Sequence, residues 1–367
     1  MVRFVKQLEG ITPYVAGAPI ELVSRRYGLD AEKVIKLASN ESPLPPFPEV
    51  LEVITRKFND LNRYPDSECR ELKAALAERH GVTTDELVVG NGSCELLIWL
   101  SLIVLEPGTE AVFSDPTFLV YEEATCARGA APVKVPLMGF ANDLNSLAAA
   151  VTDRTRIVFL TNPHNPTGSY LPYSDIAAFA ADIPDDCLLV LDEAYNEYAE
   201  QPDSQDGLKL ARERANVVVL RTFSKIYGLC GLRVGYGISS RQVKEAIDKV
   251  RQPFNVNMLA QAAALKALSL EDRLRERREQ NRAGRRQLYD GLAALGIGYV
   301  ETASNFMLVD VSGLSTPADD VPEELMKRGV IVRPGRPLAC PGYVRVSVGT
   351  GEENRIFLER LAELSNG

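Results

Sequence analysis

One lysine, Lys225, lies in a sequence context that favours chemistry at its amine. Residues 221–233 read Arg-Thr-Phe-Ser-Lys-Ile-Tyr-Gly-Leu-Cys-Gly-Leu-Arg, so a hydroxyl precedes the lysine and Arg233 follows it eight residues later. An amine forms a Schiff base with an aldehyde only when it is partly deprotonated, and a nearby cation or desolvation lowers the pKa of a lysine toward that state. The segment is therefore typical of a covalent cofactor anchor, although an isolated Ser-Lys pair is most often a surface turn.

Two further motifs carry polar groups at positions where buried strands are expected to end. Residues 90–95, Gly-Asn-Gly-Ser-Cys-Glu, form a glycine turn that opens a helix, where free backbone N–H groups can hold a phosphate. Residues 162–168, Asn-Pro-His-Asn-Pro-Thr-Gly, present amide side chains on a stiff backbone, although a tight turn alone would also explain them. Ligands of open α/β sheets collect at the carboxyl ends of the strands, so we expect these motifs to meet there.

A carboxylate, Asp192, closes the apolar run of residues 188–195, Leu-Leu-Val-Leu-Asp-Glu-Ala-Tyr. A buried carboxylate is costly unless it has a partner. A protonated pyridine nitrogen would be such a partner, and holding that proton turns the ring into an electron sink. A helix-capping aspartate is the alternative interpretation. The glycines after Lys225 do not follow Gly-x-Gly-x-x-Gly spacing, which argues against a nicotinamide enzyme.

The elements that must position these groups alternate between short apolar runs and helical periodicity. Strands are predicted at residues 86–90, 111–114, 157–160, 188–191, 217–220 and 233–236. Repeated strand, crossover and strand predict an α/β domain, residues 41–255, with a mostly parallel sheet sandwiched by helices.

The remainder of the chain predicts a smaller α+β domain. Residues 256–367 begin with a long charged helical stretch, 258–295, that we expect to bridge the two domains. Residues 1–40 lack a sheet pattern of their own, and we expect them to form an arm that joins the small domain.

Composition excludes several functions. The 367 residues are 46% hydrophobic and 25% charged, as in globular proteins, and the formal charge of −9 argues against binding to nucleic acid or anionic membranes. The apolar run 96–105 is about half of a membrane span. Six scattered cysteines and two histidines indicate neither a metal site nor a disulfide framework. The start, which has no secretory signal, predicts a cytoplasmic protein.

In their order and joint occurrence, the motifs resemble those of the fold-type I (class I/II) aminotransferases that use pyridoxal 5'-phosphate. The resemblance runs from residue 12 to residue 349 and is strongest to the branch of the family that acts on histidinol phosphate. It implies transamination of L-histidinol phosphate with 2-oxoglutarate in histidine biosynthesis. Aminotransfer from phenylalanine or tyrosine and decarboxylation of threonine phosphate remain the alternatives, whereas a regulator on this fold would need an additional DNA-binding module.

The resemblance also implies roles for individual residues. Lys225 would anchor the cofactor and act as general base, Asp192 would hold the pyridine nitrogen, and Tyr195 with Asn165 would bind the phenolic oxygen. The other expected cofactor contacts are Gly92, Ser93, Cys94, Phe118, Thr222, Ser224 and Arg233, together with Tyr64, which would reach the partner's cofactor phosphate across a homodimer interface. The expected substrate contacts are Tyr14, Asn40, Arg333 and Arg345.

Two features depart from the family's pattern. Cys94 stands where an acidic residue is usual, and residues 333–342 lack the glycine-tyrosine character common in that loop. Both lie near expected phosphate groups, so they bear on the substrate more than on the chemistry.

Overall fold

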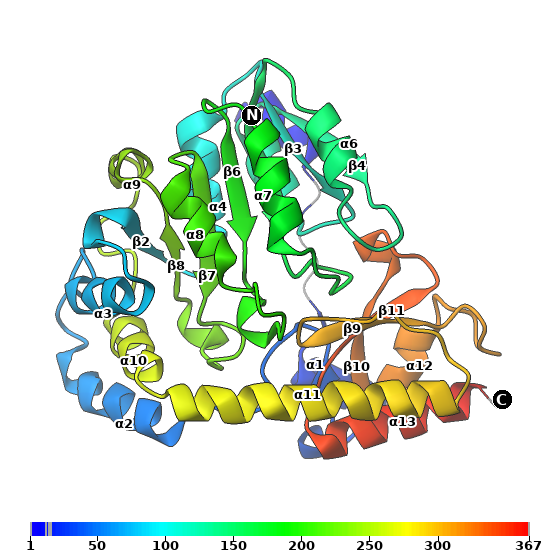
Figure 1. The fold of residues 1–367 in the computed structure, drawn as a ribbon. Coiled ribbons are helices and arrows are strands. Elements are labelled where there is room, and N and C mark those ends of the chain that lie inside the picture. Colours follow the sequence, from blue (N-terminus) through cyan, green and yellow to red (C-terminus); the bar gives the residue numbers. More distant parts are fainter. Residues whose placement is uncertain (1, 12, 14–16, 366–367) are drawn as a thin grey trace.

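The computed structural model describes residues 2–11, 13 and 17–365, and its strands form two sheets (Figure 1). The larger sheet has seven strands in the order β2-β8-β7-β6-β5-β3-β4. In chain order these are β2 (Leu87–Gly90), β3 (Glu110–Asp115), β4 (Ala131–Pro136), β5 (Thr155–Thr161), β6 (Leu188–Asp192), β7 (Val217–Thr222) and β8 (Gly235–Ile238). Strands β3 to β7 run parallel, and β8 is antiparallel to both of its neighbours.

Both faces of this sheet are covered, which explains why its strands are continuous apolar runs. Alternate residues of β7 enter different cores: Val217 and Val219 pack in one, and Val218 in the other. The first core includes residues of α2 (Pro48–Lys57), α3 (Arg70–His80), α6 (Leu144–Ala149), α7 (Tyr173–Asp182), α8 (Asp206–Glu213) and α10 (Met258–Leu268). The second includes residues of α4 (Ser93–Val104), α5 (Val120–Ala127) and α9 (Arg241–Asp248). The sheet is therefore buried on both sides, as parallel sheets are.

The smaller sheet has four strands in the order β1-β10-β11-β9. They are β1 (Ile35–Leu37), β9 (Phe306–Asp310), β10 (Val330–Pro334) and β11 (Tyr343–Ser347), accompanied by the helices α1 (Ile20–Tyr27), α12 (Val321–Lys327) and α13 (Gly351–Ser365). The long helix α11 (Glu271–Ala294) runs along the lower edge of Figure 1, beneath both sheets. Its Leu288 and Leu292 pack in the core of the smaller sheet.

The predicted fold class is confirmed, with local corrections. The charged stretch 258–295 is two helices, α10 and α11, because the helical pattern is interrupted at residues 269–270. In the larger sheet β4 was not predicted, and no strand was predicted in residues 1–40, where β1 lies. The strand expected at 233–236 lies at 235–238, since Arg233 has a left-handed backbone (φ 60°) that no strand residue adopts.

The domain limits near residues 40 and 255 stay a prediction. In the part of the chain that the structure describes, none of the helices combines the length and the apolar character needed to cross a membrane.

Candidate active site

A cavity of about 230 Å³ lies at the carboxyl ends of the central strands of the larger sheet. It is lined by most of the residues that the sequence predicts to bind a cofactor: Ser93, Cys94, Phe118, Asn165, Asp192, Tyr195, Thr222, Ser224, Lys225 and Arg233. The structure thus brings together motifs that are more than a hundred residues apart in the sequence. The ends of parallel strands meet at one edge, which is why these motifs converge.

Lys225 follows β7 and its side chain lies in this cavity, partly buried. The ammonium Nζ donates to the backbone carbonyl of Ser39 at 3.5 Å and lies 5.3 Å from the centre of the Tyr195 ring. Both neighbours are uncharged. The amine therefore has weak partners that a bound carbonyl group can replace.

Asp192 ends β6, lines the cavity and is only 4% exposed. Its Oδ2 accepts from the Tyr121 hydroxyl at 2.8 Å and its Oδ1 from the Ala194 N–H at 3.2 Å. Burial raises the pKa of Asp192 to about 6, while these two hydrogen bonds act in the opposite direction. A buried carboxylate supported by neutral donors is suited to a cationic ring nitrogen.

The turn between β2 and α4 contributes backbone donors at a helix N-terminus. Gly92 has φ 76°, and a Cβ there would lie 2.6 Å from Nη2 of Arg233, so only glycine fits. The Arg233 guanidinium donates to the Asn91 carbonyl at 3.4 Å and to the Ser224 hydroxyl at 3.3 Å. Thr222 donates to the Ser224 hydroxyl at 3.0 Å. Helix N–H groups, two hydroxyls and a guanidinium together form a cup suited to a phosphate.

Two residues of the expected substrate set, Asn40 and Arg345, hydrogen-bond residues that line this cavity, although they do not line it themselves. Asn40 is buried and donates through Nδ2 to the Tyr195 hydroxyl at 3.1 Å. Arg345, on β11, donates through Nη1 to Oδ1 of Asn165 at 2.7 Å and through Nη2 to the Ala38 carbonyl at 3.2 Å. These contacts place Asn40 and Arg345 against two predicted cofactor contacts.

Arg333 and Tyr64 are placed differently. Arg333 is buried on β10, directly opposite Arg345 in the antiparallel register. Tyr14 lies outside the described residues. Tyr64 is 81% exposed, stacks on Phe254 with ring centres 4.6 Å apart, and lines a different cavity from Lys225.

Several residues of the site were not predicted from the sequence. The most important is Tyr121, whose hydroxyl binds Asp192 and whose ring stacks on Phe159 with centres 4.7 Å apart. The available signal was its position three residues after Phe118, whose ring it contacts with centres 5.9 Å apart. Ser39, Glu41, Thr161 and Cys230 also line the cavity.

Burial and the charge of Asp192 raise the pKa of Cys94, which keeps this thiol neutral.

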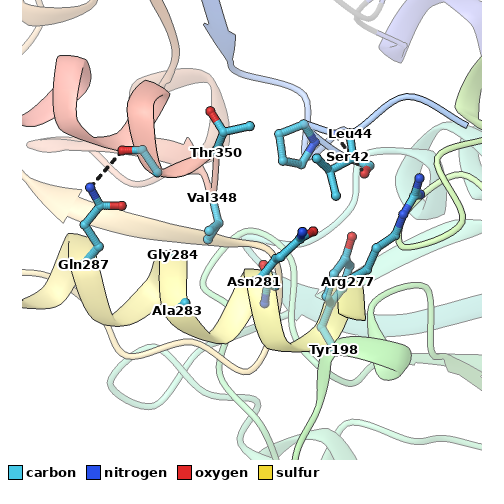
Figure 2. Close-up of a pocket in the computed structure, with 14 residues that line it drawn as sticks. Ser42, Leu44, Tyr198, Arg277, Asn281, Ala283, Gly284, Gln287, Val348 and Thr350 are labelled. Atoms are coloured by element: carbon cyan, nitrogen blue, oxygen red, sulfur yellow. Dashed lines mark hydrogen bonds between the residues drawn. The ribbon is translucent and has the colours of Figure 1, made fainter. Parts of the chain in front are cut away.

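A second cavity, of about 270 Å³, lies between α11, residues 42–44 and residues 348–351 (Figure 2). At its edge the buried Arg277 of α11 donates to the Ile226 carbonyl at 2.7 Å and to the Pro45 carbonyl, and its guanidinium lies 3.9 Å from the centre of the Phe47 ring. Ile226 directly follows Lys225. The long helix therefore fixes the backbone that carries the lysine.

A lysine above a buried carboxylate, next to a phosphate cup at the edge of a parallel sheet, defines the class of protein: an enzyme of pyridoxal-phosphate fold type I. The sequence agrees, since residues 32–361 match the profile of the family described as aminotransferase class I and II. The chain belongs to the class I and II aminotransferases.

Individual relatives are similar over nearly the whole chain. A histidinol-phosphate aminotransferase of Moorella thermoacetica is 43% identical over 355 residues, which cover 96% of this chain and 91% of that protein. Histidinol-phosphate aminotransferase 2 of Pseudomonas aeruginosa is 43% identical over 357 residues, which cover 97% and 96%. The crystal structure of histidinol-phosphate aminotransferase from Sinorhizobium meliloti in complex with pyridoxal-5'-phosphate superposes with a TM-score of 0.90 at 32% identity, covering 100% of this chain and 98% of that chain.

Proposed function

We propose that this aminotransferase moves the amino group of L-histidinol phosphate to 2-oxoglutarate, with pyridoxal 5'-phosphate as its cofactor. The observation that carries the chemistry is the cavity in which Lys225 and the buried Asp192 lie together beside the phosphate cup. The substrate is supported by the two relatives at 43% identity, both of them histidinol-phosphate aminotransferases.

The residues of the cavity fit this cofactor group by group. Ser93, Ser224 and Arg233 would hold its phosphate, and the carboxylate of Asp192 would face its ring nitrogen. Tyr195 and Asn165 would donate to its phenolic oxygen, and Phe118 would lie against the ring. When bound, pyridoxal phosphate supplies an electron sink for the bond that breaks at the substrate's α-carbon.

Lys225 and Asp192 then divide the acid–base work. The amine of Lys225 would take the proton from the substrate's α-carbon and deliver it to the cofactor's aldehyde carbon, acting first as general base and then as general acid. Asp192 would keep the ring nitrogen protonated, and the Tyr121 hydroxyl orients this carboxylate through its hydrogen bond. Tyr195 is kept in orientation by Asn40.

The anionic end of the substrate is assigned to Arg345 and Arg333. Their Cα positions are directly opposite on the antiparallel strands β10 and β11, so both side chains project from the same face of the sheet. Guanidinium groups bind phosphate in a bidentate manner, which suits the phosphate of histidinol phosphate. Tyr14 stays part of this prediction.

A homodimer completes the site in this proposal. Tyr64 is exposed and does not line the cavity that contains Lys225, and we assign it to the cofactor phosphate of the partner. An isolated chain would then have an incomplete phosphate cup.

Two measurements test the function. The first compares kcat/KM for histidinol phosphate with kcat/KM for phenylalanine, each with 2-oxoglutarate as acceptor; a preference for phenylalanine refutes the substrate. The second records the visible absorbance of lysine-bound cofactor in Lys225→Ala protein. If this variant keeps both the band and the turnover of amino donors, the anchor has been wrongly assigned.

A further inference from the structure

The exposed ring of Tyr64 packs against a second aromatic side chain of the same chain. Its ring stacks on Phe254 with centres 4.6 Å apart and planes 21° apart. Phe254 has φ 57°, a left-handed backbone that costs a bulky residue free energy and persists only where the surroundings enforce it. The surrounding structure therefore holds Phe254, on which Tyr64 stacks, in a fixed conformation.

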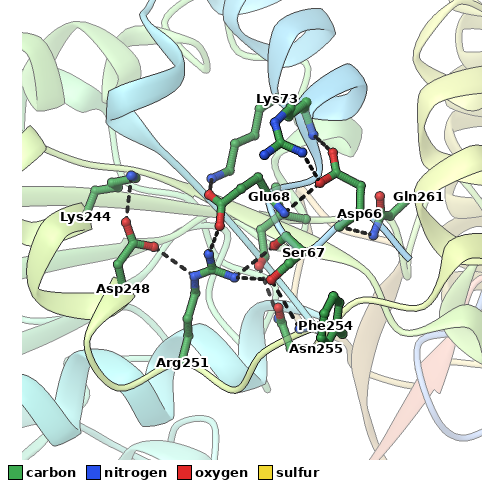
Figure 3. A network of polar contacts seen from close by, with 12 residues as sticks. Asp66, Ser67, Glu68, Lys73, Lys244, Asp248, Arg251, Phe254, Asn255 and Gln261 are labelled. Carbon is green, nitrogen blue, oxygen red and sulfur yellow. Dashed lines mark hydrogen bonds and ion pairs between the residues drawn. The ribbon is translucent and has the colours of Figure 1, made fainter. Parts of the chain in front are cut away.

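Polar contacts around Arg251 enforce this arrangement (Figure 3). Arg251 donates to the Ser67 carbonyl at 2.9 Å and pairs with Glu68 and, at 2.8 Å, with Asp248. The Phe254 N–H donates to the Ser67 hydroxyl at 3.3 Å. Segment 251–255 is thus tied to Ser67 and Glu68, which lie three and four residues after Tyr64.

The same segment also contacts the phosphate turn of its own chain. Asn255 donates through Nδ2 to Oε2 of Glu95 at 2.8 Å, and its carbonyl accepts from Asn91 at 2.6 Å. Any effect of Phe254 on cofactor binding has two conceivable routes: through Tyr64 to the partner's site, or through Asn255 to its own.

We propose that Phe254 is a positioning residue that holds Tyr64 in the orientation in which it completes the partner's phosphate cup. This proposal rests on the proposed function, which assigns Tyr64 to the partner. A tyrosine with 81% of its surface exposed would otherwise sample several rotamers, and the stack reduces the conformational entropy that it loses on contact with the phosphate.

Heterodimers separate the two routes. One chain carries Lys225→Ala and a first affinity tag, and the other keeps Lys225 and carries a second tag, so that lysine-bound cofactor forms in one site only. The Tyr64 that serves this site belongs to the Lys225→Ala chain. The readout is the rate at which the visible absorbance decays when the released cofactor is trapped, with the dimer verified by sedimentation.

Phe254→Ala in the Lys225→Ala chain is expected to speed cofactor loss by roughly threefold to tenfold, the range that an aromatic pair contributes. The same substitution in the other chain is expected to leave the rate within about twofold, as for surface changes. Phe254→Tyr, which keeps the ring, is expected to behave as wild type in either chain. Phe140→Ala, at a similarly exposed phenylalanine outside these segments, serves as the matched control.

Three results would overturn the proposal. Phe254→Ala could speed cofactor loss only when it is in the Lys225-bearing chain, or in neither chain. Alternatively, the Phe254→Tyr variant could lose cofactor as fast as Phe254→Ala does. Phe254→Leu repeats the test should the alanine variant fail to assemble. Tyr64→Ala in the Lys225→Ala chain examines the proposed function separately. If that change has no effect, the donation of Tyr64 is wrong; if it has an effect and Phe254→Ala has none, only the role of Phe254 is refuted.

Discussion

Replacing Tyr121 by phenylalanine isolates one hydrogen bond to the carboxylate of the active site. The substitution removes the hydroxyl that donates to Asp192 at 2.8 Å and leaves the ring, which stacks on Phe159 at 4.7 Å between centres. Tyr121 is fully buried, so water does not replace the lost donor without a change in packing. The variant therefore reports what the hydroxyl contributes in each ionisation state of Asp192.

The expected cost depends on pH. Burial raises the pKa of Asp192 from its ordinary 3.8 to about 6. Because the folded state binds this proton more tightly than the unfolded state, Asp192 stabilises the folded apoprotein at low pH, and this stabilisation is lost as the pH rises from 3.8 to about 6. The hydrogen bond from Tyr121 stabilises the folded apoprotein most when the Asp192 carboxylate is ionised. A hydrogen bond to a charged acceptor contributes about 1.5–3 kcal/mol and one between neutral groups about 0.5–1.5 kcal/mol. Tyr121→Phe should therefore cost more stability at pH 8 than at pH 5.

Urea unfolding of the apoprotein at both pH values measures this difference. Tyr236→Phe is the matched control, because its buried hydroxyl is hydrogen-bonded at 2.9 Å to His80, whose pKa burial lowers to about 3. His80 is neutral at pH 5 and at pH 8, so the control variant should lose the same stability at each. An equal cost of Tyr121→Phe at the two pH values would refute the view that the tyrosine stabilises an ionised Asp192.

Three further substitutions test other parts of the site. Gly235→Ala places a Cβ 2.7 Å from the backbone of Gly92 and Ser93, so it should weaken pyridoxal phosphate binding by about tenfold in an absorbance titration, whereas Gly231→Ala, with no atom within 4 Å of its Cβ, should not. Glu193→Gln breaks the buried pair with Arg221 at 2.7 Å and should cost about 3–5 kcal/mol in urea unfolding, while Glu245→Gln in the exposed pair with Arg241 should change stability little. Arg345→Ala should weaken binding of histidinol phosphate by about 2–5 kcal/mol in a calorimetric titration, and a loss well under 1 kcal/mol would mean that Arg345 does not pair with the substrate's anion.

The cofactor motifs were predictable because each follows a buried strand. The apolar runs before Asp192 and Lys225 fix the edge of the sheet at which their side chains emerge, so a common cavity follows from topology alone. Tyr121 was not predictable in the same way, since its role depends on which face of α5 meets the sheet. The contact of Lys225 with Ser39 uses a backbone carbonyl, which any residue type supplies.

The missed strand β1 illustrates a different limit. With three residues it is too short for a periodic signal, and it exists because it pairs in parallel with β10 near the other end of the chain. The strand that was misplaced by two residues follows Arg233, whose left-handed backbone delays entry into β8. In both cases the determining contact is tertiary.

The short segment that leaves β1 links the base of the proposed reaction to the expected anion site. The Ala38 carbonyl accepts from Arg345, the next carbonyl, of Ser39, accepts from Lys225, and the next side chain, of Asn40, donates to Tyr195. Asn40 has φ 53°, a conformation that asparagine tolerates better than most residues, and its N–H donates to Ser347 of β11 at 2.9 Å. Because residues 38–40 contact residues of both sheets, a shift of β1 against β10 would move the carbonyl that accepts from Lys225 and the carbonyl that accepts from Arg345 together. If Arg345 binds the substrate's anion as proposed, this segment would couple the position of that arginine to the position of the Lys225 amine.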